Sequence, residues 1–327
     1  MTGGLPKVVA TNRVFAETRA LFEGRAAVAA PEGDAPLAGA ALADALRDAD
    51  AMMAFMTDRV DAALLAECPR LRVIGAALKG HDNIDLAAAE AAGVTVCIVP
   101  DLLTVPTAEL AIGLMLALGR HVLAADRAIR EEGFPGWRPR FYGTGIAGTT
   151  VGLVGQGAVG RAIAARLAGF DCRVLSHDPG RGDDPGALDT LLAQSDWVVL
   201  AAPLTPANLH LIGAEALGRM KPGARLVNPA RGSLVDEAAV AEALETGRLA
   251  GYAADVFECE DAINPDRPVT VPPRLAAPGA PTVLTPHIGS AVEGVRREIE
   301  RAAATAILDV LAGRAPGGRV AGPERRC

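Results

Sequence analysis

A histidine and two glutamates stand where they could form an acid–base pair. His287 lies just past an apolar run and just before a long helical pattern, and open α/β proteins bind ligands at the carboxyl edge of the sheet. Glu258 and Glu260 follow another such run. A carboxylate there could accept a hydrogen bond from the histidine ring and orient it, as general acid–base catalysis requires. The spacing favours neither glutamate, and the alternative for His287 is a helix cap.

An arginine in a tight turn is a candidate anion-binding group. Arg231 lies between a proline and a glycine, directly after a third apolar run. A guanidinium held in this way can bind an oxyanion through two parallel hydrogen bonds. The alternative is an ion pair with Asp236 or Glu237. The remaining histidines are expected to be surface or structural residues: His81, His121, His177 and His210.

The most specific motif is glycine-rich. The residues Gly155, Gln156, Gly157, Ala158, Val159 and Gly160 follow the apolar run Val151–Val154 and open the helical pattern Ala158–Gly169. In a dinucleotide-binding fingerprint the first glycine permits the tight turn, the second lets the backbone approach the pyrophosphate, and the third lets helix and strand pack closely. The N-terminus of the helix then offers N–H groups to the phosphates. The alternative is a glycine turn without a ligand.

An acidic residue in the right place favours one cofactor. Asp178 follows the next predicted strand, 18 residues past Gly160. A carboxylate there accepts hydrogen bonds from the adenosine ribose and repels a 2′-phosphate. We therefore expect NAD rather than NADP, although Arg181 leaves some use of NADP open. The alternative is an acidic residue that merely caps the strand end.

These residues need a frame that brings strand ends together. Short β-branched runs alternate with Ala/Leu-rich helical patterns, which predicts parallel sheets with helices on both faces. Two series of runs imply two domains: Lys7–Ala10, Ala51–Phe55, Arg72–Ala76 and Val94–Val99, then Thr150–Val154, Arg173–Ser176, Trp197–Ala201, Arg225–Val227, Gly251–Ala254 and Thr282–Leu284. Two long helices are expected over Thr107–Glu132 and Ser290–Ala312. The fold class is therefore α/β, with two Rossmann-like doubly wound domains, of which the first is discontinuous.

Composition excludes several classes of protein. The chain of 327 residues suffices for about two domains. Its net charge of −7 makes it a poor match for nucleic acid or an anionic membrane surface. The longest apolar run, Leu110–Gly119, is about half a bilayer span. Five cysteines lack the spacing of a metal site or a disulfide framework. We therefore expect no metal. Because no secretory leader is evident, we expect a cytoplasmic protein.

Four segments together resemble the D-isomer-specific 2-hydroxyacid dehydrogenases: the fingerprint, Asn228–Glu237, Asp255–Glu260 and Thr285–Ser290. The resemblance covers nearly the whole chain. It implies an NAD-binding domain over 103–287, inserted in a substrate domain made of 1–102 and 288–327, and a homodimer with a dimerisation arm near 133–147. It also implies three catalytic residues, Arg231, Glu260 and His287. The choice of Glu260 over Glu258 rests on the resemblance alone.

Further segments resemble the phosphite (phosphonate) dehydrogenase branch of that family: Ala51–Met56, Ala77–Gly80, Val99–Leu110, Phe141–Gly145, Gly251–Glu260 and His287–Val292, with Arg296 beyond them. This resemblance implies a substrate site of Lys79, Gly80, Arg231, Arg296, Met56, Trp137, Tyr142 and Ser290. It implies that the cofactor is held by the fingerprint and Asp178 together with Thr107, Pro203, Pro229, Asp255 and His287. The aromatic residues near Trp137 suit a dimer arm as well as a pocket.

The expected reaction is therefore the NAD-dependent oxidation of phosphite to phosphate. Lys79, Arg231 and Arg296 would neutralise the oxyanion. His287, oriented by Glu260, would take the proton of the attacking water. The first alternative is a D-2-hydroxyacid dehydrogenase of the hydroxypyruvate or glyoxylate reductase type. The second, from another class, is a non-enzymatic dinucleotide-sensing corepressor.

Overall fold

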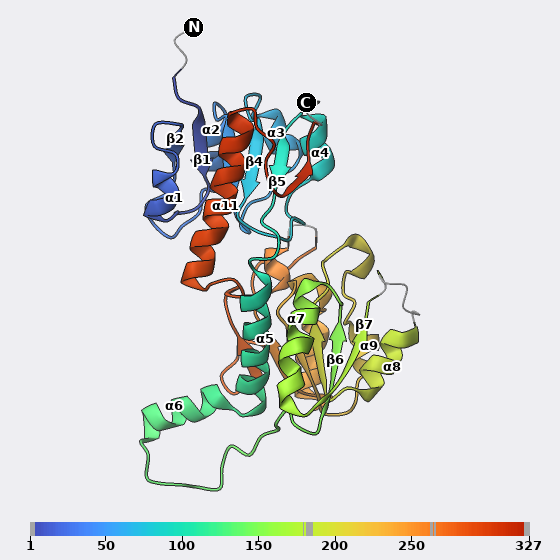
Figure 1. Ribbon diagram of the computed structural model, residues 1–327. Helices are drawn as coiled ribbons and strands as arrows, with labels where there is room; N and C mark the ends of the chain where they lie inside the picture. Colours follow the sequence, from blue (N-terminus) through green and yellow to red (C-terminus); the bar gives the residue numbers. More distant parts are fainter. Residues whose placement is uncertain (1–3, 179, 181–185, 262–263, 265, 324–327) are drawn as a thin grey trace. The chain divides into compact units, whose positions relative to one another are not determined.

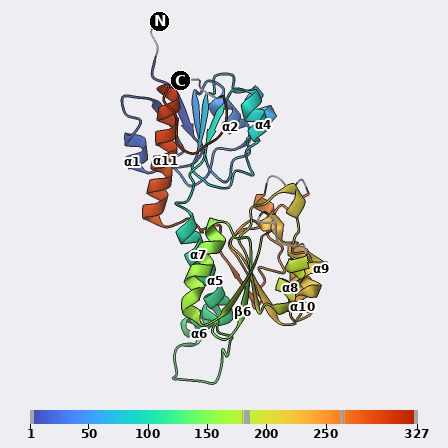
Figure 2. The ribbon, with the colours of Figure 1, turned by 45° about the vertical axis from the view of Figure 1, so that its right-hand side comes forward.

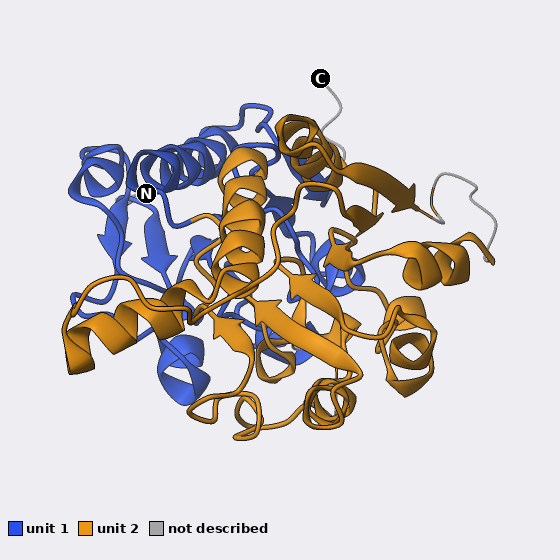
Figure 3. Cartoon of the chain, turned by 90° about the horizontal axis from the view of Figure 1, so that it is seen from below, with its two compact units in different colours: residues 1–103, 291–327 blue, residues 104–290 orange. Residues whose placement is uncertain are grey.

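The chain forms two compact units, which Figure 3 distinguishes by colour. Unit 1 comprises residues 1–103 and 291–327, and unit 2 comprises 104–290. The expected boundaries were 102/103 and 287/288. This computed structural model describes residues 4–178, 180, 186–261, 264 and 266–323. Arg181 lies outside the described residues.

Unit 1 is built on a six-stranded sheet in which five neighbouring strands run parallel. The order is β12-β5-β4-β3-β1-β2, with β1 Lys7–Ala10, β2 Ala27–Ala29, β3 Ala51–Ala54, β4 Val73–Ala76, β5 Thr95–Cys97 and β12 Arg319–Ala321. The last strand pairs antiparallel with β5. All residues of β3 and β4 are buried. These continuous apolar runs are typical of parallel strands that are covered on both faces.

Helices cover both faces of this sheet (Figures 1 and 2). They are α1 Ala16–Ala20, α2 Gly39–Leu46, α3 Ala62–Ala66, α4 Leu86–Ala91 and α11 Glu293–Leu311. Because strand side chains alternate between faces, Met53 packs with Ile307 of α11 and Met52 packs with Leu46 of α2. A Cβ on Gly75 would lie 2.6 Å from Ile307, so α11 rests directly on β4.

Unit 2 carries a second six-stranded sheet, and each neighbouring pair of strands in it is parallel. Its order is β11-β10-β9-β8-β6-β7. The strands are β6 Thr150–Val154, β7 Arg173–His177, β8 Trp197–Leu200, β9 Ala224–Asn228, β10 Leu249–Ala254 and β11 Thr282–Leu284. The chain runs from β6 outward to β7 and then crosses back to β8. This order defines a doubly wound sheet with a switch point between β6 and β8.

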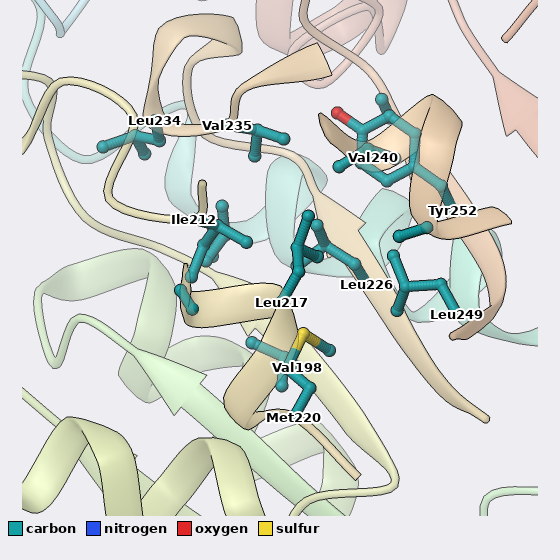
Figure 4. Packing of buried hydrophobic residues seen from close by; sticks show 14 of the residues in the cluster. Val198, Ile212, Leu217, Met220, Leu226, Leu234, Val235, Val240, Leu249 and Tyr252 are labelled. Carbon is teal, nitrogen blue, oxygen red and sulfur yellow. The ribbon is translucent and has the colours of Figure 1, made fainter. Parts of the chain in front are cut away.

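Two helical layers enclose the unit 2 sheet. On one face α5 Thr104–Gly119 and α7 Ala158–Leu167 lie side by side (Figure 1). On the other lie α8 Gly186–Gln194, α9 Ala214–Arg219 and α10 Glu237–Glu245. Figure 4 shows the core beneath this second layer, where Leu217 and Val240 pack with the strand residue Leu226. The predicted doubly wound α/β fold, including the discontinuous unit, is confirmed.

Two local expectations are wrong. The predicted long helix Thr107–Glu132 is two helices, α5 and α6 Val122–Glu132, because His121 adopts a left-handed conformation with φ of +52°. The strands β2 and β12 were not expected. They are only three residues long and have half-buried or exposed residues, so they lack the apolar run that marks the other strands.

A search of the described residues finds no single helix that has both the length and the apolarity to span a membrane. The helices α5 and α6 pass that test only as a pair, across a bend of 59°. Half of α5 is buried within the fold, including Met115 and Leu114.

Candidate active site

Each strand of unit 2 ends beside a residue that the sequence analysis selected. Because the strands are parallel, their carboxyl ends meet at one edge of the sheet, which is where such folds bind ligands. The sheet order groups these residues into two halves. The strands β6, β7 and β8 precede the fingerprint, Asp178 and Pro203, whereas β9, β10 and β11 precede Arg231, Glu260 and His287.

The fingerprint loop has the close packing that its glycines predict. Gly155 has a φ of +106°, and a Cβ on it would lie 2.6 Å from the backbone of Ala201. A Cβ on Gly160 would lie 2.1 Å from the carbonyl oxygen of Gly155. A Cβ on Gly157, the N-cap residue of α7, would meet nothing within 4 Å. The backbone is therefore open where a pyrophosphate would approach the helix N-terminus.

A cavity of about 540 Å³ borders this loop at the switch point. Its size lies within the range of about 300–1,000 Å³ that is typical of cofactor pockets. Its lining comes from the ends of β6, β7 and β8, from α8 and from the segment before α9, and includes Gly155, Gly157, His177, Asp178, Leu188, Ala202, Pro203 and Leu211. The residues present therefore fit a bound dinucleotide.

Asp178 is held in place by the fingerprint loop. Its Oδ2 accepts a hydrogen bond of 2.7 Å from the backbone N–H of Gln156, and its Oδ1 accepts one of 3.0 Å from Gly180. These bonds fix the carboxylate at the end of β7, beside the cavity. A carboxylate at this position is the group that accepts hydrogen bonds from an adenosine ribose in such folds.

His287 lies in a turn that Asp255 organises. Both carboxylate oxygens of Asp255 accept backbone hydrogen bonds, from Ile288 at 2.8 Å and from Gly289 at 2.7 Å, and Thr285 donates its hydroxyl at 2.6 Å. Burial raises the pKa of Asp255, and these donors oppose the shift. The turn holds His287 at a φ of +55°, a conformation that non-glycine residues adopt only when their surroundings impose it.

The ring of His287 is paired with Glu260. The distance from Nδ1 of His287 to Oε2 of Glu260 is 2.7 Å, and Oε1 of Glu260 accepts a hydrogen bond from Phe257 N–H at 2.9 Å. The imidazole is 22% exposed, so its other nitrogen can reach a substrate. This geometry is that of a histidine whose tautomer and orientation are fixed by a carboxylate.

Glu258, the other candidate, faces away from His287. Its Oε2 lies 3.0 Å from Nε2 of His210 and its Oε1 accepts a hydrogen bond from Glu237 N–H at 2.8 Å. Both glutamates lie in the 3₁₀ turn η5, Glu258–Glu260. Spacing alone could not distinguish them because a turn directs residues two apart to different sides.

The loop that carries Arg231 is fixed by its neighbours. The amide of Asn228 accepts a hydrogen bond from Ala230 N–H and donates one to the carbonyl oxygen of Arg231. Leu234 is fully buried in the core of Figure 4. A Cβ on Gly232 would lie 1.8 Å from the carbonyl carbon of Phe257, so this loop touches the backbone that leads to Glu260. Sequence analysis missed Asn228, since an asparagine at a strand end carries no distinctive signal.

The remaining cofactor candidates, Thr107 and Pro229, lie in two different parts of unit 2. The hydroxyl of Thr107 donates to the carbonyl oxygen of Gly289 at 3.4 Å, beside the His287 turn. Pro229 lies in the Arg231 loop, between β9 and the 3₁₀ turn η4 Gly232–Leu234. Ser290 is buried at the end of the His287 segment and belongs to unit 2.

Four substrate candidates belong to unit 1. Nζ of Lys79 lies 3.3 Å from Oδ1 of Asp101, and Gly80 follows it in the same loop. The guanidinium of Arg296 donates to the carbonyl oxygen of Ala77 at 3.3 Å. Burial lowers the pKa of Arg296. Met56 is half-buried against the core of the unit.

Trp137 and Tyr142 lie in the arm, the segment 133–149 between α6 and β6 (Figure 1). Gly143 in this segment packs against the backbone of Gly119, at the end of α5 opposite to Thr107. The side chains of Trp137 and Tyr142 are 79% and 76% exposed. Since α5 has 16 residues, its length of about 24 Å separates the arm from the His287 turn. Within one chain the structure therefore does not bring these aromatic residues to His287.

Within the described part of the chain, no group of three or more His, Cys, Asp or Glu side chains is arranged to hold a metal ion. The described cysteines are free thiols.

Comparison with known proteins identifies the family. Residues 112–289 match the family model described as D-isomer specific 2-hydroxyacid dehydrogenase, NAD binding domain. The chain therefore belongs to this family of oxidoreductases, and unit 2 contains its NAD-binding domain.

The similar curated relatives are glyoxylate reductases. That of Thermofilum pendens is 39% identical over 83% of this chain and 81% of its own. That of Pyrococcus horikoshii is 37% identical over 83% and 82%. Among solved structures, the TT0316 protein of Thermus thermophilus has a TM-score of 0.85 at 34% identity, covering 96% of this chain and 99% of its own.

A further solved structure is an NADPH-dependent glyoxylate/hydroxypyruvate reductase of Sinorhizobium meliloti in complex with NADP and malonate. Its TM-score is 0.81 at 27% identity, and the match covers 99% of this chain and all of the other. This structural relative is thus described as NADPH-dependent, whereas the matching family model is named for NAD.

The expectation of phosphite oxidation is wrong, because the similar relatives are named glyoxylate reductases. That expectation treated Lys79 and Arg296 as cations added for phosphite. Lys79 lies 3.3 Å from Asp101 and Arg296 donates to the carbonyl oxygen of Ala77, and neither cation distinguishes phosphite from a carboxylate, since both are oxyanions. Arg231, Glu260 and His287 suit a 2-keto acid equally well.

Proposed function

We propose that this protein reduces a small 2-keto acid of the glyoxylate type to the corresponding 2-hydroxy acid. The overall reaction is keto acid, NADH and a proton giving hydroxy acid and NAD. The observation that carries the proposal is the 2.7 Å pair of His287 and Glu260 in an NAD-binding domain of this family. The identities to glyoxylate reductases support the choice of substrate.

NADH, when bound, supplies the hydride that reduces the keto carbon. His287 in its protonated form donates the proton that the carbonyl oxygen needs as it becomes a hydroxyl. Glu260 accepts the hydrogen bond of Nδ1, so it directs Nε2 to the substrate and stabilises the positive ring. Arg231 binds the substrate carboxylate, since a guanidinium can form two parallel hydrogen bonds to it.

Asp178 supports NADH as the preferred cofactor. Its carboxylate is fixed by the N–H of Gln156, next to the cavity where the adenosine ribose would bind. A 2′-phosphate there would meet a like charge, which is unfavourable for NADPH.

We also propose a homodimer in which the arm is the contact. Phe134 and Trp137 are 74% and 79% exposed, and a surface that gathers large apolar side chains is typical of a protein interface. In such a dimer a second copy could bring Trp137 and Tyr142 to the site that one chain leaves without them.

The direct test follows NADH absorbance with glyoxylate or hydroxypyruvate as substrate. We expect turnover, and His287→Asn should lower kcat by about 10² to 10⁴-fold, the usual contribution of a positioned acid. Phosphite with NAD serves as the control and should give no NADH. The proposal fails if the protein binds NADH but reduces no 2-keto acid.

A further inference from the structure

We propose that Glu237 and Glu258 form a positioning pair that holds the turn carrying Glu260 against the loop carrying Arg231. The inference rests on the proposed function, in which Glu260 orients His287. Neither residue of the pair touches His287, so their effect on the reaction is exerted through Glu260.

The pair is a reciprocal exchange of side-chain and backbone hydrogen bonds. Oε1 of Glu258 accepts from the N–H of Glu237 at 2.8 Å, and Oε1 of Glu237 accepts from the N–H of Glu258 at 3.0 Å. Glu237 is the first residue of α10 and Glu258 the first of η5. Both residues are buried: Glu237 is 1% exposed and Glu258 is 6% exposed. Each glutamate thereby satisfies the free N–H at the start of the other's helical turn.

Further contacts of buried carboxylates connect the same loops. Oε2 of Glu258 lies 3.0 Å from Nε2 of His210, which belongs to the loop after β8. Oδ2 of Asp261 accepts a hydrogen bond of 2.6 Å from the N–H of Ser233. The segments that follow β8, β9 and β10 are therefore connected at the carboxyl edge by buried carboxylates.

Glu260 depends on this connection because its own contacts lie within its turn and toward His287. It is the last residue of a three-residue turn, and its side chain is 35% exposed. Its side chain is bonded to His287 and to the N–H of Phe257, and its backbone N–H donates to the carbonyl oxygen of Phe257. If Glu258 loses its anchor, the turn is free to move, and a displacement of about 1 Å is enough to lower the rate of a positioned reaction.

The charges around Glu237 determine which substitution is conservative. Its Oε2 is buried and has no hydrogen-bond partner among the described residues. Burial, reinforced by the neighbouring acids Glu258, Asp261 and Glu260, raises the pKa of Glu237 to about 7. The other titratable groups near it are Tyr252, Cys259 and, across Glu258, His210. Glutamine has the shape of the neutral form and keeps the Oε1 acceptor.

The experiment compares Glu237→Ala, Glu237→Gln and a matched control. Glu242→Ala removes an exposed glutamate from the same helix and should leave kcat and KM unchanged. Glu237→Ala should lower kcat for glyoxylate by about 5- to 50-fold, less than loss of the acid itself, with little change in KM. Glu237→Gln should recover most of that loss.

A spectroscopic measurement reports on His287 without turnover. The chain has only five histidines, so the ring signals of His287 can be assigned by their absence in His287→Asn. In the NADH-bound protein, Glu237→Ala should move those signals in the same direction as Glu260→Gln does, whereas Glu237→Gln should leave them in place. Circular dichroism and NADH affinity verify that each variant is folded.

Two results would overturn the inference: unchanged His287 signals in folded Glu237→Ala, or a Glu237→Gln variant as impaired as Glu237→Ala. Failure of the proposed function looks different. In that case no 2-keto acid is reduced by the unaltered protein, while the His287 signals still respond to Glu237→Ala.

Discussion

Nδ1 of His287 lies 2.7 Å from Oε2 of Glu260, although the two residues come from different loops, after β11 and after β10. The pairing of β10 with β11 brings these loops side by side. Asp255 fixes the turn of His287 from one side, and the Phe257 N–H fixes Glu260 from the other. Contacts within unit 2 therefore position both members of the pair.

The first prediction concerns this pair. Glu260→Gln should lower kcat for glyoxylate by about 10- to 100-fold with little change in KM, because an amide stabilises the protonated imidazole less than a carboxylate does. Steady-state kinetics with NADH measure the effect. Retention of full kcat would show that orientation of His287 does not need the charge.

The second prediction concerns the cofactor. The unaltered protein should prefer NADH over NADPH by at least about tenfold in kcat/KM. Asp178→Asn should narrow this ratio, since it removes the charge but keeps an acceptor for the N–H of Gln156. Equal use of both cofactors by the unaltered protein would contradict the role given to Asp178.

The third prediction concerns the contact between two catalytic loops. Gly232→Ala places a Cβ 1.8 Å from the carbonyl carbon of Phe257, and this backbone contact can be relieved only by separating the loops. We expect a loss of about 1–3 kcal/mol in the free energy of unfolding together with a lower kcat. Gly113→Ala, at an exposed helical position with nothing within 4 Å, is the control and should be neutral or stabilising.

The fourth prediction concerns pH and stability. Asp58 is buried in unit 1, where its Oδ2 accepts hydrogen bonds from Thr11 and Phe55. Burial raises the pKa of Asp58 from 3.8 to about 6. The folded state therefore binds the proton more tightly than the unfolded state does. The bound proton stabilises the folded state below pH 4, and this contribution to the free energy of unfolding is lost as the pH rises through 6.

Asp58→Asn removes this dependence. The free energy of unfolding of the variant, relative to the unaltered protein, should rise by about 2–3 kcal/mol between pH 4 and pH 7.5. Urea denaturation at the two pH values measures the difference. Asp34→Asn, at an exposed position, should show a far smaller change, and a flat difference for Asp58→Asn would refute the assignment.

The fifth prediction concerns the proposed homodimer. Replacing Phe134 and Trp137 by serine should shift the protein from dimer to monomer in sedimentation velocity experiments, because these exposed rings supply apolar contact area. If the double substitution leaves the sedimentation coefficient unchanged, the arm is not a dimer interface.

Sequence patterns predicted the frame of this protein well, for a physical reason. Buried parallel strands such as Trp197–Leu200 need continuous apolar runs, and the glycine-rich loop needs its glycines for close backbone contact. Such requirements restrict the residue types that can occupy these positions. The short strand Arg319–Ala321 pairs through backbone groups at a sheet edge, and edge pairing makes little demand on side chains.

The details of the site were harder to predict. The choice between Glu258 and Glu260 depends on which way a 3₁₀ turn faces, and residue type does not encode that direction. The substrate was misassigned because Lys79 and Arg296 were taken as specific for phosphite, whereas a cation attracts a carboxylate as well. A charged residue in a sequence does not by itself indicate which oxyanion it binds.

The discontinuity of unit 1 has a consequence for synthesis on the ribosome. The helix α11 covers β4 and the strand β12 closes the edge beside β5, so the N-terminal 103 residues wait for the last part of the chain before their core is complete. Unit 2 is continuous in sequence and can fold as soon as it emerges, as domains generally do. The face of the unit 1 sheet that α11 covers thus lacks its partner helix for the time needed to translate the inserted 104–290. Apolar surface that is exposed in this way during synthesis favours aggregation.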